Sequence, residues 1–167
     1  MLISQTLNEA LNKQIGIEFY ADFQYLAMAV YFEERGLSNL GSFFRAQATE
    51  ERGHGLKILN YILEAGGKAV VPAVERPRSD FASTLELAEL FLSQEQGVTR
   101  NFYAMYEQAL NEKDYTTHIF LQWFVQEQLE EEATASKLLQ LVKTGGEAGI
   151  FQVEMMVASW PAGGEEE

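Results

Sequence analysis

Residues 40–61 read LGSFFRAQATEERGHGLKILNY and carry an apolar side chain at nearly every third or fourth position. This alternating spacing is the seam by which a long helix packs into a helical bundle. Three positions of the seam are polar instead, namely Gln47, Glu51 and His54. The stretch therefore predicts a long bundle helix whose buried face carries a glutamate and a histidine one turn apart.

The same spacing recurs along most of the chain. It predicts four long helices, over about 4–35, 39–65, 84–111 and 115–143. Ser4 and Ser83 or Thr84 are suitable N-caps, and glycines follow the first, second and fourth helices. Each seam is polar near its middle, and the interruptions are Glu18, then Glu51 with His54, then Glu95, then Gln128 with Glu131.

The lengths of the connections predict the topology. Short links join the first helix to the second and the third to the fourth, so each pair is antiparallel. The segment 66–83 contains Pro72 and Pro77, lacks a helical period, and at about 17 residues can extend roughly 56 Å. A helix of about 27 residues is only about 40 Å long. We therefore expect an all-α, four-helix bundle with one long crossover between the second and third helices.

The end of the chain adds two features. After Gly145 and Gly146, a short amphipathic helix is expected over about 147–159. The acidic tail at about 161–167 is expected to be flexible. Together these features describe a single domain over residues 1–167.

The composition excludes several classes of function. The chain has 25 acidic and 12 basic residues and a formal net charge of -13, which argues against nucleic acid and anionic membrane surfaces as partners. It contains no cysteine, which excludes disulfides, thiolate metal sites and a cysteine nucleophile. The first residues lack the pattern of a secretion signal, and no apolar run is long enough to span a membrane. We therefore expect a cytoplasmic protein.

The inward glutamates predict a metal site. The helix midpoints lie near residues 19, 52, 97 and 129, so the polar interruptions all lie within about one turn, ~5.4 Å, of a common level. A single buried glutamate or histidine is usually a satisfied polar group of the core, but like charges gathered there are costly. Either several carboxylates stay protonated with raised pKa values, or a cation of charge two or more binds among them. A metal is the better explanation, because no basic residue lies on the seams.

The ligand types narrow the choice of metal. Carboxylate oxygens with one imidazole suit iron or manganese, zinc less often, and copper poorly. There is room for two ions that share a bridging glutamate. Four-helix bundles with Glu-x-x-His motifs are a known setting for such sites, so the assignment matches a general pattern.

Four features of the sequence occur together: Glu18 with Tyr25 seven positions later, TEERGH at 49–54, Glu95 in SQEQ, and FLQWFVQEQLEEE at 120–132. In these features the chain resembles the non-haem bacterial ferritins. The resemblance covers nearly the whole chain. It implies a cage of 24 identical subunits that oxidises Fe(II) with O2 or H2O2 and stores the ferric product as a mineral.

The resemblance also implies a role for each site residue. A first iron would be held by Glu18, Glu51 and His54, and a second by Glu51, Glu95 and Glu131. Gln128 would hydrogen-bond a metal-bound water or oxygen species, and Tyr25 would be a nearby electron donor. A third iron site would consist of Glu50, Glu127 and Glu130.

Departures from related families limit these expectations. The haem-binding bacterioferritins have a second Glu-x-x-His, where this chain has Gln128-x-x-Glu131, and a methionine at the position of Arg52, so no haem is expected. Animal ferritins line an iron channel with carboxylates where this chain has His118 and Leu121, so His118 is expected at a surface or interface. Two alternatives stay open: a carboxylate-bridged di-metal oxidase or oxygenase acting on another substrate, and a structural bundle with a vestigial site.

Overall fold

A computed structural model describes residues 2–161, and it is helical over most of that range. The elements in chain order are α1 (Gln5–Glu33), α2 (Ser38–Glu64), α3 (Thr84–Asn111), α4 (Tyr115–Gly145), a 3-10 turn η1 (Glu147–Gly149) and α5 (Ile150–Val157). The acidic tail expected at about 161–167 lies outside the described residues apart from Pro161. None of the helices in the described part is both long and apolar enough to cross a membrane.

Side-chain caps define where the long helices begin. Ser4 accepts a hydrogen bond from the backbone N–H of Leu7, and Ser83 accepts one from Glu86, as the sequence predicts. At the other end, Gly36 and Gly66 follow α1 and α2 with φ of 75° and 74°, a conformation that other residues rarely adopt. The predicted boundaries therefore agree with the observed ones to within a residue or two.

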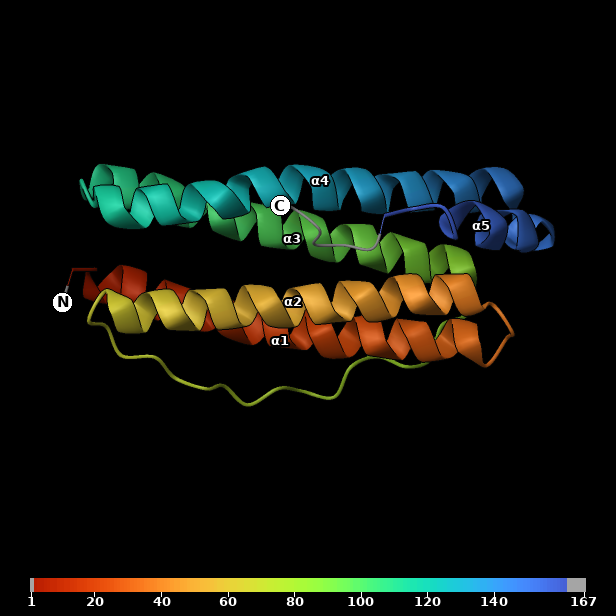
Figure 1. The fold of residues 1–167 in the computed structure, drawn as a ribbon, viewed down its shortest axis with the longest axis horizontal. Helices are drawn as coiled ribbons and strands as arrows, with labels where there is room; N and C mark the ends of the chain where they lie inside the picture. Colours follow the sequence, from red (N-terminus) through yellow and green to blue (C-terminus); the bar gives the residue numbers. More distant parts are fainter. Residues whose placement is uncertain (1, 162–167) are drawn as a thin grey trace.

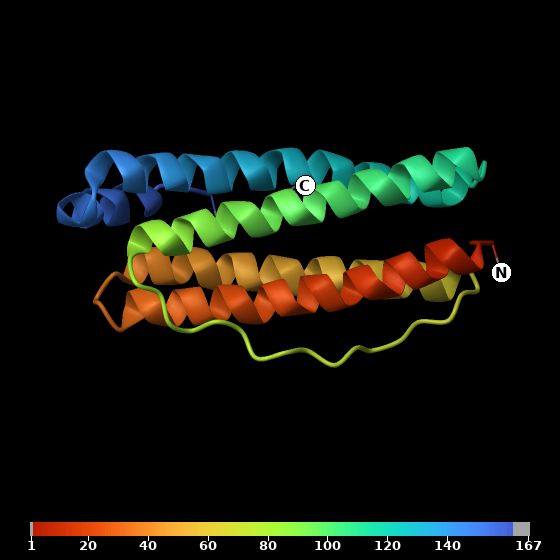
Figure 2. The same ribbon diagram turned by 180° about the vertical axis from the view of Figure 1, so that it is seen from behind.

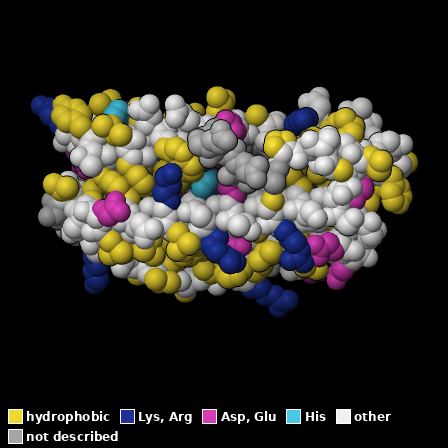
Figure 3. Space-filling view, in the orientation of Figure 1, with side chains coloured by type: hydrophobic (Ala, Val, Ile, Leu, Met, Phe, Trp, Pro, Cys, Tyr) yellow, Lys and Arg dark blue, Asp and Glu magenta, His cyan; other side chains and the backbone are white. Residues whose placement is uncertain are grey.

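The helices form two antiparallel pairs, α1 with α2 and α3 with α4 (Figures 1 and 2). The crossover runs along the whole length of the α1–α2 pair, so that α2 and α3 are parallel (Figure 1). This is the predicted four-helix bundle with one long connection. Charged side chains of both signs are scattered among apolar ones over the face that α2 and α4 present (Figure 3).

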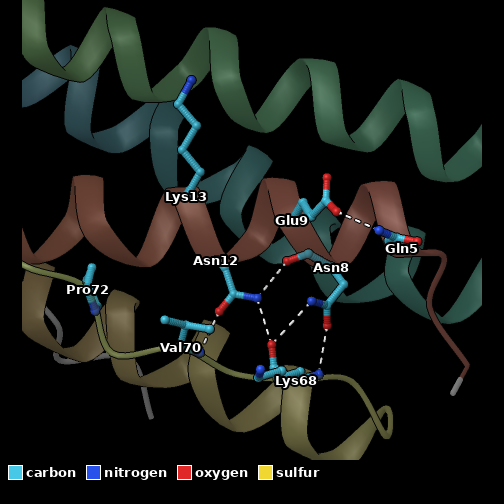
Figure 4. Close-up of a pocket in the computed structure, with 8 residues that line it drawn as sticks. All are labelled: Gln5, Asn8, Glu9, Asn12, Lys13, Lys68, Val70 and Pro72. Carbon is cyan, nitrogen blue, oxygen red and sulfur yellow. Dashed lines mark hydrogen bonds between the residues drawn. The ribbon is translucent and has the colours of Figure 1, made fainter.

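Asparagine and glutamine side chains of α1 anchor the crossover. Asn8 and Asn12 both donate to the carbonyl oxygen of Lys68, at 3.2 and 2.8 Å, and their own carbonyl oxygens accept from the backbone N–H groups of Lys68 and Val70 (Figure 4). These residues line an open cleft of about 630 Å³ between α1 and the crossover. Further along, Gln24 exchanges two hydrogen bonds with the backbone of Arg78.

The C-terminal elements differ from the single helix expected over about 147–159. The segment is divided into η1 and α5. Glu147 accepts a hydrogen bond from the backbone N–H of Thr84 (3.1 Å), and Glu154 accepts from those of Asn39 and Leu40 at 2.7 and 2.9 Å. The two carboxylates thus bind the N-termini of different helices. We attribute the division to these two attachments and to the glycine at position 149, which weakens a helix.

The core consists of two apolar clusters, one toward each end of the bundle. One contains Phe32 and Phe44, and the other contains Leu11 and Phe102. Every polar interruption of the predicted seams is buried, namely Glu18, Gln47, Glu51, His54, Glu95, Gln128 and Glu131. The polar interruptions lie between the two clusters.

Candidate metal centre

Three overlapping groups of potential metal ligands lie in the middle of the bundle. Within each group, one ligand atom of every residue lies within 4.8 Å of those of the others. The groups are Glu18 with Glu51 and His54, Glu51 with Glu95 and Glu131, and Glu50 with His54, Glu127 and Glu131. Because neighbouring groups share residues, the three form one continuous cluster drawn from all four long helices.

The first group has three ligand atoms without hydrogen-bond partners. Glu18 is completely buried, and Glu51 and His54 are at most 4% exposed. Oε2 of Glu18, Oε2 of Glu51 and Nδ1 of His54 make no hydrogen bond, although Nδ1 of His54 lies 3.4 Å from Oε2 of Glu51. Buried polar atoms are nearly always satisfied, so three unsatisfied atoms on the residues of one group suit a bound cation.

In the second group, hydrogen bonds hold both oxygens of Glu95. Oε1 accepts from the hydroxyl of Tyr25, and Oε2 accepts from Nε2 of Gln128 at 3.2 Å. Gln128 also lies 3.3 Å from the hydroxyl of Thr99. Gln128 is thus directed at a carboxylate ligand, and Tyr25 is linked to the cluster through the same carboxylate.

The third group lies at the edge of the core. Glu50 and Glu127 are half-buried and come together with His54 and Glu131. Gln47 donates to Oε2 of Glu50 at 2.9 Å. Glu130, expected from the resemblance to belong here, is exposed and is absent from the three groups that the described residues form.

Burial is the main cause of the electrostatic strain in the cluster. It raises the pKa of Glu18 well above its ordinary value, and the neighbouring Glu51 raises it further. Burial, with the charge of Glu95, also raises the pKa values of Glu51 and Glu131. The pKa of Glu50 is raised to about 7, chiefly by burial. Without a cation, burial therefore shifts each of these carboxyls toward its protonated form.

No lysine or arginine is buried among residues 2–161, so no basic side chain lies inside the core to neutralise the cluster. Six carboxylate residues and one imidazole at bridging separations are a suitable ligand set for two or three hard or borderline metal ions. One ion fits the first group and a second fits the second group, with Glu51 common to both. Such an arrangement can hold two redox-active ions side by side, which is what a two-electron reaction with a small oxidant requires.

The buried polar residues near the cluster include some that were not among the sequence candidates. Gln14 is 2% exposed and donates to Glu18, and Asp22 is 3% exposed and is paired with Arg52 at 2.8 Å. Gln14 lies on the seam of α1, three positions after Leu11 and four positions before Glu18. Following the alternating spacing, rather than the strict seven-residue row, would have identified it. Asp22 lies one turn beyond Glu18 and gave a weaker signal, since it is off the seam.

Two further ring side chains of α4, Trp123 and His118, differ in how they relate to the cluster. Trp123 is half-buried, with its ring 5.5 Å from that of His54 and the ammonium of Lys57 3.5 Å over its face. His118 is half-buried, its ring centre lies 4.1 Å from that of Tyr106 with the two rings tilted by 36°, and it belongs to none of the three groups. His54 is therefore the histidine that can serve as a ligand in this cluster.

Comparison with known proteins identifies the family of the chain. Residues 8–144 match the ferritin-like domain family. The chain belongs to the ferritins. It is 48% identical over 132 residues to a bacterial non-heme ferritin of Staphylococcus aureus (strain MRSA252), an alignment that covers 79% of this chain and 80% of that one. A bacterial non-heme ferritin of Staphylococcus epidermidis is 42% identical over 133 residues, or 80% of each chain.

Solved ferritin structures have the same fold. The crystal structure of an open pore ferritin from the archaeon Archaeoglobus fulgidus superposes with a TM-score of 0.91 at 36% identity, over 96% of this chain and 99% of the other. The predicted fold class and the resemblance to non-haem bacterial ferritins are therefore confirmed. The roles of individual residues in this ferritin are proposals, which follow.

Proposed function

We propose that this ferritin oxidises Fe(II) at the central cluster and stores the ferric product inside an oligomeric cage. The observation that carries the proposal is the set of buried, unpartnered ligand atoms of Glu18, Glu51 and His54, which adjoins a second carboxylate group. Relatives named as non-heme ferritins support iron as the metal. Iron is here the substrate and the cargo, so the protein needs to bind it and then release it.

The two neighbouring groups provide places for two iron ions. In this proposal Glu18 and His54 bind one Fe(II), Glu95 and Glu131 bind the other, and Glu51 bridges them. Each ion gives up one electron, so the pair supplies the two electrons that, with two protons, reduce O2 to H2O2. With H2O2 as oxidant, the same two electrons and two protons yield two waters.

The anionic ligands favour the product over the substrate. Carboxylates bind Fe(III) more strongly than Fe(II), since the charge attraction is larger and the core has a low dielectric constant. Tyr25 can supply a further electron from beside Glu95, to which its hydroxyl is hydrogen-bonded. Burial raises the pKa of Tyr25 well above its usual value, and Glu95 adds to the effect, so its phenol stays protonated until it is oxidised.

The third group offers a route away from the pair. Glu50 and Glu127 share His54 and Glu131 with the other two groups but are half-buried, so an ion there lies nearer to solvent. We propose that Glu50 and Glu127 form a third iron site and that the exposed Glu130 receives iron as it leaves. Because Glu130 is exposed and belongs to none of the three groups, its contribution should be the weaker one.

The cage and its location complete the proposal. We propose that the single domain assembles into a homo-oligomer of 24 subunits, by analogy with the family, and functions in the cytoplasm. Phe151, Met155 and Met156 of α5 support assembly, because these large apolar side chains are between 48 and 73% exposed. An apolar face of this size on a short helix is better accommodated against another subunit than in water.

Aerobic addition of Fe(II) tests the proposal. Stopped-flow absorbance should record a transient followed by the broad absorption of ferric mineral, and size-exclusion chromatography should recover iron in a high-mass particle. An oxidase acting on another substrate would give the transient but leave iron unmineralised. A structural bundle would give neither, and either result would contradict the proposal.

A further inference from the structure

The side-chain amide of Gln14 holds the carboxylate of Glu18, a member of the first metal group. Gln14 is 2% exposed and lies one turn before Glu18 on α1. Its Nε2 donates to Oε1 of Glu18 at 2.8 Å, a bond between neighbouring positions on one helix face. The other oxygen of Glu18, Oε2, is buried and has no partner. The two oxygens of this carboxylate are therefore used differently.

This difference determines which oxygen of Glu18 is available to a metal ion. A carboxylate can rotate about its last bond, and this torsion is broad, so an unrestrained glutamate presents either oxygen. An N–H donor held in the core removes that freedom, because turning Oε1 away would leave a buried donor and acceptor unpaired. With Oε1 held by Gln14, Oε2 is the atom left for a metal ion, alongside Glu51 and His54.

Two other carboxylates of the cluster are held in a similar way. Gln47 donates to Glu50 at 2.9 Å, and Gln128 donates to Glu95 at 3.2 Å. The contact of Gln128 is longer and shared, since the same amide nitrogen also lies 3.3 Å from the hydroxyl of Thr99. Nε2 of Gln14 serves Glu18 alone among the side-chain hydrogen bonds of the described residues.

We propose that Gln14 is a positioning residue for metal binding, which orients Glu18 so that Oε2 faces the ion shared with Glu51 and His54. This inference rests on the proposed metal site, but it concerns binding and not oxidation. Residues that orient metal ligands through hydrogen bonds typically change metal affinity 10- to 100-fold when they are replaced. We expect the replacement of Gln14 to change metal affinity within that range, because Glu18 belongs to only one of the three groups.

The experiment replaces Gln14 with leucine, which removes the donor and keeps most of the volume. Co2+ is added anaerobically to the metal-free protein, and its visible absorption bands, which report the ligands, are titrated. We expect the first ion to bind about 10- to 100-fold more weakly with altered bands, while later ions change less. Oxidation of iron plays no part in this readout.

Gln24→Leu is the matched control. Gln24 lies on the same helix, is completely buried, and binds the backbone of Arg78 in the crossover, outside the three metal groups. The control loses buried amide bonds but should bind Co2+ like the wild type. If Gln14→Leu does not fold, Gln14→Met, an unbranched apolar chain of similar length, replaces it.

Each outcome is decisive. Wild-type Co2+ affinity and spectrum in the Gln14 variant would overturn the inference, and so would an equal loss in the Gln24 variant, which would indicate general loosening of α1. If Gln14→Leu weakens Co2+ binding but wild-type protein fails to oxidise Fe(II), the proposed function fails and the inference stands. If the wild type oxidises Fe(II) rapidly and Gln14→Leu binds Co2+ normally, only the inference fails.

Discussion

Replacing Glu154 with alanine should weaken the attachment of α5 to the bundle. Glu154 is 7% exposed and accepts hydrogen bonds from the backbone N–H groups of Asn39 and Leu40, at 2.7 and 2.9 Å. These groups belong to the first turn of α2, whose N-cap residue, Leu37, provides no side-chain bond. The cap of α2 is therefore supplied from a helix more than a hundred positions later in the chain.

The magnitude follows from these contacts. Losing an N-cap costs about 1 kcal/mol, and losing a carboxylate at a partly buried helix N-terminus costs up to ~2 kcal/mol more. We therefore expect Glu154→Ala to lower the free energy of unfolding by about 2–3 kcal/mol. Glu154→Gln should cost about 1 kcal/mol, because the amide keeps one acceptor and loses the charge.

Glu147→Ala is the control. Glu147 is exposed, makes one longer bond of 3.1 Å to the N–H of Thr84, and contributes to a helix that Ser83 already caps. Its loss should cost less than about 0.5 kcal/mol. The assay is urea unfolding of the metal-free protein, followed by far-UV circular dichroism at one protein concentration, since assembly makes stability depend on concentration.

Equal effects of the Glu154 and Glu147 substitutions would refute this reasoning. So would a cost below about 0.5 kcal/mol for Glu154→Ala, which would mean that α5 is held by Val153 and Val157, its buried apolar residues, and not by the cap.

Two further predictions concern the third group. Because burial holds the pKa of Glu50 at about 7 in place of its ordinary 4.5, the folded state takes up a proton between these values and the wild type loses stability as pH rises through them. The full shift corresponds to ~3 kcal/mol, and allowing for the partial exposure of Glu50 we expect about 1–2 kcal/mol. In urea unfolding of the metal-free proteins, the free energy of unfolding of Glu50→Gln relative to the wild type should therefore be higher by this amount at pH 8 than at pH 4.5. A difference between the two proteins that does not depend on pH would count against the prediction. Glu127→Ala should change the ratio of iron oxidised to O2 consumed while sparing the first fast phase, and Glu130→Ala should do so less; oxygen-electrode traces identical to wild type for both would exclude the third site.

The fold could be predicted from the sequence because its determinants are local. The seams of α1 to α4 repeat a single spacing, and Pro72 and Pro77 mark the one segment that cannot be helical. Connection length then leaves few topologies. The division of the C-terminal segment into η1 and α5 was not predicted, because it depends on contacts with the distant N-termini of α2 and α3.

The candidate site was predictable to the extent that ligands lie on the seams. Glu51 and His54 interrupt an apolar row, and helix geometry alone brings such interruptions to one level. The orientation of individual side chains was not predictable in this way. Gln128 donates to Glu95, and Glu130 is exposed to solvent although it adjoins the buried Glu131. These differences depend on side-chain rotation and on the offset between helices, which spacing does not encode.

The most direct test of the account compares the two histidines of the chain. His54 lies in the cluster, and His118 packs against Tyr106 outside it. We predict that His54→Ala abolishes or greatly slows the fast phase of Fe(II) oxidation in stopped-flow absorbance, while His118→Ala oxidises iron at the wild-type rate and both variants elute as the same particle. Unchanged fast oxidation in an intact His54→Ala particle would contradict the assignment of the central cluster as the site of iron oxidation.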